Sequence, residues 1–266
     1  MIFISAKSIK VKMDQDRVYV SESNILLCDG IGSYNRSGEV ADIAIQHLQC
    51  ANNNLELKSF IITAHAEILN KQIIGGTTML SAIVMEDNSK MMLAYLGNGS
   101  IYHFNGDLFD QPDSYKDLNK VHRYINYLLP HVDKDGALLK HISNYSTDEE
   151  LDPSSLELSL NGLHGDVIFM FTDGISSLEE DLIIADDQSR VWRNQSENVN
   201  SILNDWDIWM KANCHDINKE KIDKFLEDEL ALLKENKKLD DDASIGLIMT
   251  ERAIDYYKMK YNAGKA

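Results

Sequence analysis

Apolar residues recur along this chain with two spacings, one typical of strands and the other of helices. Short β-rich or continuously apolar runs predict strands at residues 7–12, 17–21, 24–28, 77–85, 90–96, 100–104, 167–172 and 245–249. Longer stretches with apolar residues three or four positions apart predict helices at residues 39–50, 57–68, 116–129, 199–212, 217–235 and 251–261. Between them, the polar residues 144–159 predict a loop, and the acidic residues 179–187 predict a solvated segment.

The order of these elements predicts the fold class. Strands and helices come in separated runs instead of alternating one by one, which favours an α+β fold with largely antiparallel sheets flanked by helices. The chain has only 3 Pro and 14 Gly, and it shows no linker rich in Pro, Gly or Ser. Residues 1–266 are therefore expected to form a single domain.

The charge of the chain disfavours two classes of partner. Its 26 Lys and Arg against 43 Asp and Glu give a net charge of −17. Nucleic acids and anionic membrane surfaces attract Lys and Arg, so neither is an expected partner. The longest apolar runs, such as residues 167–171, have about five residues, whereas a membrane-spanning helix needs about 20.

The N-terminal residues and the cysteines indicate the compartment. Residues 1–7 lack the apolar stretch and the small-residue cleavage site of a signal peptide. The three cysteines, Cys28, Cys50 and Cys214, show no paired spacing. They suit a reducing cytosol better than a disulfide framework or a zinc site, so a cytoplasmic location is expected.

Acidic residues recur at the ends of apolar strands. The places are Asp29-Gly30, Asp173-Gly174 and Asp240-Asp241-Asp242, with Asp14-Gln15-Asp16 just before the strand at 17–21. Carboxylates gathered at strand ends repel one another, and such a cluster is stable mainly when divalent cations neutralise it. Oxygen ligands of this kind suit Mg²⁺ or Mn²⁺. Taken singly, Asp-Gly is also a common hairpin turn, and Gly106-Asp107 and Asp135-Gly136 are interpreted as such turns.

The flanks and the order of these acids carry a family resemblance. Five motifs follow one another between about residues 7 and 250 and are found at 16–41 (including Asp29-Gly30), 75–78 (Gly-Gly-Thr-Thr), 96–100 (Leu-Gly-Asn-Gly-Ser), 165–174 (Gly-Asp to Thr-Asp-Gly) and 241–245 (Asp-Asp-Ala-Ser-Ile). In this order and spacing the chain resembles the metal-dependent type 2C protein phosphatases, the PPM-type serine/threonine phosphatases, of the bacterial kind. Each motif alone is common, and the combination is specific.

The resemblance implies a four-layer β-sandwich, in which two antiparallel sheets are flanked by helices and metals lie at one end between the sheets. It implies that Asp29 bridges two Mn²⁺ or Mg²⁺ ions and that the Gly30 carbonyl binds one of them. Asp173 and Asp241 would bind the other ion. Asp16 would support metal-bound water, so Asp16 and Asp29 are the expected catalytic residues.

The same resemblance implies a reaction and its partners. A water or hydroxide that bridges the two ions would attack phosphorus directly and hydrolyse phosphoserine or phosphothreonine. The expected partners are a phosphoprotein substrate and a cognate Ser/Thr kinase. Residues 178–215 stand where the family has a variable flap, and a flap subdomain is expected there.

The chain departs from the family pattern at the third metal and at the phosphate site. Asn98 and Ser177 stand where many relatives have carboxylates that bind a third metal, so that site is expected to be absent or very weak. Val11 stands where relatives have a phosphate-holding Arg. Lys10 and Lys12 flank Val11, but strand side chains alternate, so both are expected to point away from its face.

The sequence assigns neither the cation that contacts the phosphate nor the general acid. Arg17 and Arg36 are further candidates for the phosphate contact. Ile31 follows Asp29-Gly30 where some relatives have His, so no general acid is named.

Two alternatives stay open from the sequence. The missing Arg and third-metal carboxylates fit a pseudophosphatase, which keeps the fold as a binding or regulatory module. Retention of Asp29, Asp173 and Asp241 favours an enzyme, because a degenerate site has no reason to keep a costly acidic cluster. Asp14-x-Asp16-x-Val18 also fits the nucleophile motif of haloacid-dehalogenase phosphatases, but that motif normally follows an apolar strand.

Overall fold

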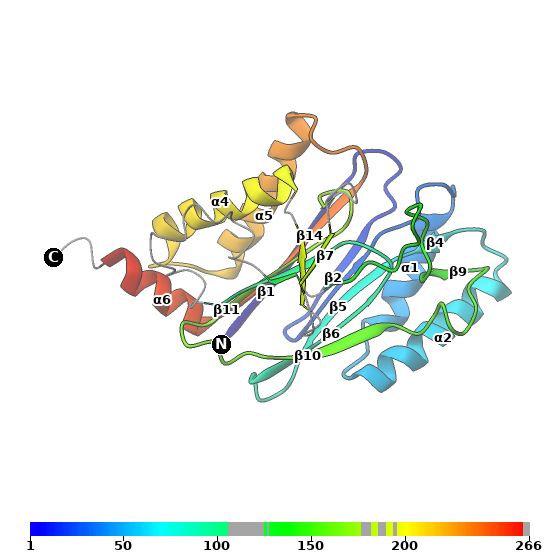
Figure 1. Ribbon diagram of the computed structural model, residues 1–266, viewed down its shortest axis with the longest axis horizontal. Helices are drawn as coiled ribbons and strands as arrows, with labels where there is room; N and C mark the ends of the chain where they lie inside the picture. Colours follow the sequence, from blue (N-terminus) through cyan, green and yellow to red (C-terminus); the bar gives the residue numbers. More distant parts are fainter. Residues whose placement is uncertain (106–124, 127, 177–181, 186–189, 194–195, 263–266) are drawn as a thin grey trace.

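Two antiparallel sheets lie face to face between two layers of helices (Figure 1). This arrangement is seen in a computed structural model, which describes residues 1–105, 125–126, 128–176, 182–185, 190–193 and 196–262. It confirms the α+β class and the four-layer sandwich expected from the sequence.

The first sheet has the strand order β1-β14-β11-β7-β8-β13-β12. Its strands are β1 (Ile2–Ile9), β7 (Ser100–Asn105), β8 (Ile125–Asn126), β11 (Asp166–Phe171), β12 (Leu182–Ala185), β13 (Arg190–Arg193) and β14 (Ala243–Thr250). The last strand in the chain, β14, lies between β1 and β11, and Ile248 pairs with Ile4 on one side and Ile168 on the other. Every residue of β11 and β14 is buried because both faces of this part of the sheet are covered.

The second sheet has the strand order β10-β6-β5-β3-β2. Its strands are β2 (Arg17–Val20), β3 (Asn24–Cys28), β5 (Met79–Val84), β6 (Lys90–Leu96) and β10 (Ser154–Ser159). A separate two-stranded sheet pairs β4 (Gly76–Thr77) with β9 (Ile142–Ser143).

The helices cover the outer faces of the two sheets (Figure 1). Helices α1 (Ser37–Leu48) and α2 (Asn54–Asn70) pack on the second sheet, and α4 (Glu197–Asn213), α5 (Lys219–Glu235) and α6 (Glu251–Asn262) pack on the first. Polar caps fix where three of them begin: the side chains of Asn53, Ser196 and Asn218 accept backbone N–H groups of the first turns of α2, α4 and α5.

Three apolar cores hold the layers together, one between the sheets and one under each helical layer. Strand β3 shows how one short segment serves two of them. Ile25 and Leu27 point into the core between the sheets, whereas Leu26 and Cys28 point into the core under α1 and α2. Successive strand residues face opposite sides, which explains why β3 is apolar throughout.

Two strands differ from the sequence prediction in their bounds or existence. β1 spans Ile2–Ile9, so the predicted strand at 7–12 is wrong at both ends, and residues 10–12 lie beyond the sheet. β10 falls within the predicted loop at 144–159. It is an edge strand whose residues are alternately half-buried and exposed, and its polar Ser and Glu side chains hide this pattern.

Two further strands fall in segments predicted otherwise. β8 occupies residues 125–126 of the predicted helix at 116–129, where the prediction is wrong; the rest of that prediction lies mostly outside the described residues. β12 occupies 182–185 within the acidic segment 179–187, most of whose other residues also lie outside the described part. Among the described helices, none is both long and apolar enough to cross a membrane.

Candidate active site

Three carboxylates meet at one end of the sandwich. Asp29 follows β3, Asp173 follows β11 after one intervening residue, and Asp16 directly precedes β2. The carboxyl group of Asp29 interacts with those of both Asp16 and Asp173. The three acids therefore form a row with Asp29 in the middle.

Two hydroxyl groups fix Asp16 at the end of this row. Its Oδ2 accepts hydrogen bonds from Ser244 Oγ at 2.7 Å and Thr172 Oγ1 at 3.1 Å. Thr172 and Ser244 lie on neighbouring strand ends, where the Thr172 backbone N–H donates to the Ser244 carbonyl at 3.1 Å. The other oxygen, Oδ1, is buried and has no hydrogen-bond donor.

Burial dominates the electrostatics of Asp16 and Asp29. It raises the pKa of Asp29 well above the usual range, and the charges of Asp16 and Asp173 raise it further. Burial also raises the pKa of Asp16 to about 6, although the hydrogen bond from Ser244, the neighbouring Asp29 carboxyl group and the hydrogen bond from Thr172 lower it in part. Neighbouring desolvated carboxylates of this kind are costly unless protons or cations neutralise them.

The loop that follows Asp29 is held in place by its backbone. The Asp29 carbonyl accepts hydrogen bonds from Thr78 N at 2.8 Å and Thr77 Oγ1 at 2.9 Å. A Cβ at Gly30 would lie 2.6 Å from Gln15 Cβ, so only glycine lets this loop pack against the segment that carries Asp16.

Asp241 and Asp242 are adjacent in sequence but have different contacts. Asp241 Oδ2 lies 3.8 Å from Lys12 Nζ and 3.5 Å from the point that a Cβ on Gly32 would occupy. Asp241 therefore faces the loop after Asp29 from the start of β14. Asp242 instead accepts backbone N–H groups of Val11 at 2.6 Å, Lys12 at 2.8 Å and Gln15 at 2.8 Å.

These contacts give Asp242 a structural role. Burial alone would raise its pKa, but the backbone donors at residues 11–15 outweigh burial and bring the pKa below the usual range. Its carboxylate thus stays charged and ties the segment before β2 to the start of β14.

The donor chemistry of the row fits a hard divalent cation. All three side chains offer oxygen, and Asp16 Oδ1 is a buried acceptor without a donor. Within the described residues, however, no three side chains of His, Cys, Asp or Glu already form a group that could hold a metal ion. The row supplies the charge and the ligand type, and Asp241, which has Lys12 as its cationic neighbour, faces the loop after Asp29.

Asn98 contacts the row directly, a role that the sequence analysis did not assign. Its Nδ2 donates to Asp173 Oδ2 at 2.6 Å. A neutral amide thus occupies the position expected to lack a third-metal carboxylate. Ser177, the second position of that expected site, lies outside the described residues, so the weakness of a third site stays a prediction.

The cations around the site differ from the sequence expectation. β1 ends at Ile9, so the alternation rule applied to Lys10 and Lys12 does not hold there. Val11 is half-buried against the core under α4, α5 and α6, whereas Lys12 reaches Asp241. Arg17 is paired with Asp42 and Arg36 with Glu39.

Thr172 and Ser244, which fix Asp16, were also missed as functional residues. Both stand inside motifs already recognised for their acids, next to Asp173 and two residues after Asp242. The sequence did offer a signal for them, since a hydroxyl residue close to an acid at the end of an apolar strand can hold a carboxylate in place.

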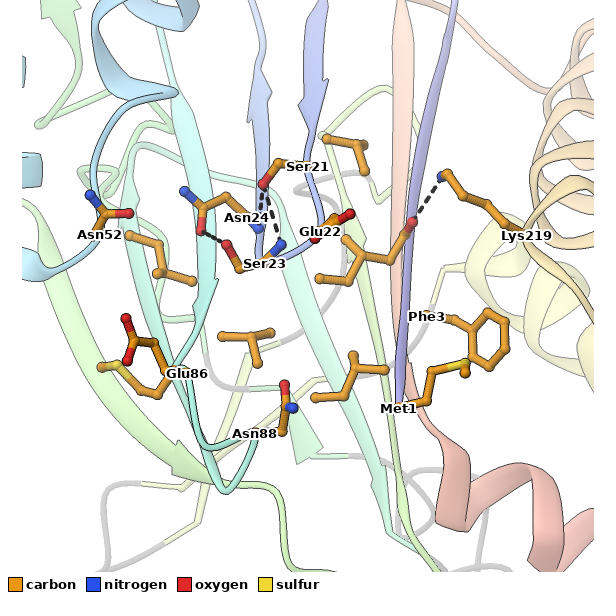
Figure 2. Close-up of a pocket in the computed structure, with 16 residues that line it drawn as sticks. Met1, Phe3, Ser21, Glu22, Ser23, Asn24, Asn52, Glu86, Asn88 and Lys219 are labelled. Carbon is orange, nitrogen blue, oxygen red and sulfur yellow. Dashed lines mark hydrogen bonds between the residues drawn. The ribbon is translucent and has the colours of Figure 1, made fainter.

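A cavity of about 1080 Å³ lies at the opposite end of β3 from Asp29. Figure 2 shows Ser21, Ser23 and Asn24 on one side of it and Lys219 on the other. Its lining residues include none of Asp16, Asp29 and Asp173, so this cavity is separate from the acidic row. The chemistry of the candidate site therefore lies elsewhere.

Comparisons with known proteins identify the fold. No protein-family model matches the sequence, and no curated protein matches it. Among solved structures, the Mycobacterium tuberculosis serine/threonine phosphatase PstP matches at 12% identity over 94% of this chain and 99% of its own, with a TM-score of 0.60. The PPM fold is present in this chain. PppA of Pseudomonas aeruginosa, described as a key regulatory component of T6SS, shares it at 12% identity, 94% and 98% coverage and a TM-score of 0.61.

One PPM structure in this group was solved with metal. The catalytic domain of PstP in complex with 2 manganese ions matches at 12% identity, with coverage of 93% of this chain and 97% of that domain and a TM-score of 0.59. The resemblance inferred from the motifs is thus confirmed at the level of the PPM fold.

Proposed function

We propose that the chain is a metal-dependent phosphoprotein phosphatase that hydrolyses phosphoserine and phosphothreonine with two Mn²⁺ or Mg²⁺ ions. The observation that carries the proposal is the row Asp16–Asp29–Asp173, in which burial and neighbouring carboxylates raise the pKa of Asp29 and in which Asp16 Oδ1 has no hydrogen-bond partner. The PPM fold and the manganese-bound mycobacterial relative support it. A cytoplasmic location and a cognate kinase belong to the same proposal.

In this proposal Asp29, the Gly30 carbonyl, Asp173 and Asp241 hold the ions. Bound divalent cations supply a water of lowered pKa and neutralise charge on the phosphate. Asp16 is held by Thr172 and Ser244, so its free Oδ1 is available to accept a proton from the attacking water. Water attacks phosphorus and passes a proton to Asp16, the bond from phosphorus to the serine or threonine oxygen breaks, and that oxygen takes up a proton from solvent.

The phosphate itself needs a cationic side chain. Lys12 is proposed for this role, because its Nζ lies 3.8 Å from Asp241 Oδ2 and its side chain is 56% exposed. A lysine of this kind can leave a carboxylate partner and contact a phosphate oxygen as a point charge.

The test is hydrolysis of p-nitrophenyl phosphate with and without Mn²⁺. We expect Mn²⁺-dependent turnover in the wild type, and a loss of about 100-fold or more in Asp173→Ala, since that carboxylate holds an ion. Asp240→Ala removes an exposed neighbouring acid and should behave as the wild type. A wild-type rate of Mn²⁺-dependent hydrolysis no higher than that of Asp173→Ala would refute the proposal that the chain is an enzyme.

The rival proposal is a binding or regulatory module with the same fold. Val11 at the position of the phosphate-holding Arg is the observation in its favour. Calorimetry separates the two proposals: a module would bind a phosphopeptide or Mn²⁺ without releasing phosphate. Phosphate release that follows Mn²⁺ occupancy would exclude the module.

A further inference from the structure

His131 is bound tightly to the turn that carries Asn98. Its Nδ1 lies 3.2 Å from the Gly97 backbone N–H, and its own backbone N–H donates to the Gly97 carbonyl at 2.8 Å. The imidazole stacks on Tyr95 with a centroid distance of 4.8 Å and an interplanar angle of 18°. Nε2 contacts Ser154 Oγ at 2.8 Å.

These partners fix the form of the imidazole. Because Nδ1 accepts the Gly97 N–H, the neutral ring carries its proton on Nε2 and donates it to Ser154. Burial, together with the nearby charge of Lys140, lowers the pKa of His131 to about 4. The ring therefore keeps its acceptor on Nδ1 at neutral pH.

The turn has little room for any other shape. Gly97 and Gly99 have φ values of +95° and +109°, in the region that favours glycine. A Cβ on Gly97 would lie 2.6 Å from Thr78 Cγ2. Asn98 stands between them with 5% of its surface exposed, and its amide donates to Asp173 Oδ2 at 2.6 Å.

We propose that His131 is a positioning residue for Asp173: by accepting the Gly97 N–H on Nδ1, it aims the Asn98 amide at Asp173 Oδ2 and so fixes the orientation of that carboxylate. The inference rests on the proposed function in one respect, namely that Asp173 binds a cation. No sequence motif of the candidate site contains His131, which reaches it only through the fold.

A pair of variants isolates the acceptor atom. His131→Phe keeps a ring to stack on Tyr95 but removes the acceptor, whereas His131→Asn loses the stack and restores an acceptor oxygen near the position of Nδ1. Ser154→Ala removes only the partner of Nε2. If the ring has only a structural role, His131→Phe should cause the smaller loss. If His131 positions Asn98, His131→Asn should cause the smaller loss.

The first readout is Mn²⁺ affinity by calorimetry. The contacts from His131 through Gly97 and Asn98 to Asp173 form a relay. Loss of its first hydrogen bond in His131→Phe should weaken Mn²⁺ binding about tenfold, while His131→Asn and Ser154→Ala should stay within about threefold of the wild type. In the Asn98→Ala background, His131→Phe should add no further loss, because the relay is already cut. Equal Mn²⁺ affinity in the wild type and His131→Phe would overturn the inference.

The second readout needs no metal. In the wild type, NMR should detect a scalar coupling from Gly97 N to His131 Nδ1 across their hydrogen bond, and the Asn98 side-chain amide resonances should move in His131→Phe and return in His131→Asn. Absence of the coupling, or unmoved Asn98 resonances, would contradict the relay. Failure of the wild type to bind Mn²⁺ would instead overturn the proposed function together with the metal part of the inference. The NMR measurements would then still test whether His131 positions Asn98.

Discussion

The amide of Asn98 sets the charge beside Asp173, so a single atom change there should be informative. Asn98→Asp replaces a 2.6 Å hydrogen bond with two facing carboxylates. Without metal, the free energy of unfolding of Asn98→Asp should be about 1–3 kcal/mol below that of the wild type. Adding Mn²⁺ should raise the free energy of unfolding more in Asn98→Asp than in the wild type. Thermal unfolding with and without Mn²⁺ measures both effects. Asn98→Ala loses the bond without adding charge, and a Mn²⁺ gain as large as that of Asn98→Asp would contradict this reasoning.

Lys12 offers a second test at this scale. If it contacts the substrate phosphate in the ground state and the transition state alike, Lys12→Met should raise KM for p-nitrophenyl phosphate by about three- to tenfold with little change in kcat. Lys10→Met removes another exposed cation two residues away and is the matched control. Equal KM values in the two variants would remove Lys12 from the phosphate site.

The residue scale also shows where sequence reasoning ends. Motif order was enough to single out Asp16, Asp29 and Asp173, which the fold brings into contact. It also assigned Asp241 to an ion, but it could not show that Asp242 accepts backbone N–H groups of residues 11–15, because these contacts depend on the fold. His131 was invisible for the same reason, since its role is set by a turn more than thirty positions earlier in the chain.

At the scale of elements, buried strands were the most predictable. β3, β11 and β14 read as apolar runs because both of their faces are covered. The bounds of β1 and the existence of β10 were not predictable in this way. Both are edge strands, whose half-exposed polar positions dilute the period of two.

The packing of α5 gives a prediction about pH. Glu229 on this helix is only 7% exposed, and burial, then the charges of Asp205 and Asp228, raises its pKa to about 7. The folded-state pKa lies above the unfolded value of about 4.5, so the folded protein binds this proton more tightly than the unfolded chain. The stability that the bound proton contributes is complete below about pH 4.5 and is lost as pH rises through about 7.

Glu229→Gln should remove this loss. We expect it to be about 1–2 kcal/mol more stable than the wild type at pH 8, after allowance for solvent screening, and similar at pH 4.5. Urea unfolding at both pH values measures the difference. Glu220→Gln, on an exposed position of the same helix, is the control; a pH-independent difference between Glu229→Gln and the wild type would argue against titration of Glu229.

For the whole molecule, the net charge of −17 governs encounters with substrates. Three acids are confined to the row and Asp242 to its backbone contacts, so most of the remaining acids give a field that repels an anionic peptide. We expect kcat/KM for an acidic phosphopeptide to rise as NaCl approaches about 0.15 M, where the Debye length is about 8 Å. The reference substrate is a basic phosphopeptide at saturating Mn²⁺, for which the rate should fall. A flat or falling profile for the acidic peptide would refute this field effect.

The place of β14 in the first sheet also determines when the contacts around Asp16 form during folding. It follows all the other described strands along the chain, yet it enters the first sheet between β1 and β11. Contacts between such distant parts of a chain form slowly, after local ones. Until residues 242–244 join the sheet, Asp16 lacks the Ser244 donor and residues 11–15 lack the Asp242 carboxylate. A chain in which β14 has not joined the sheet therefore carries Asp16 without one of the hydroxyl donors that fix it.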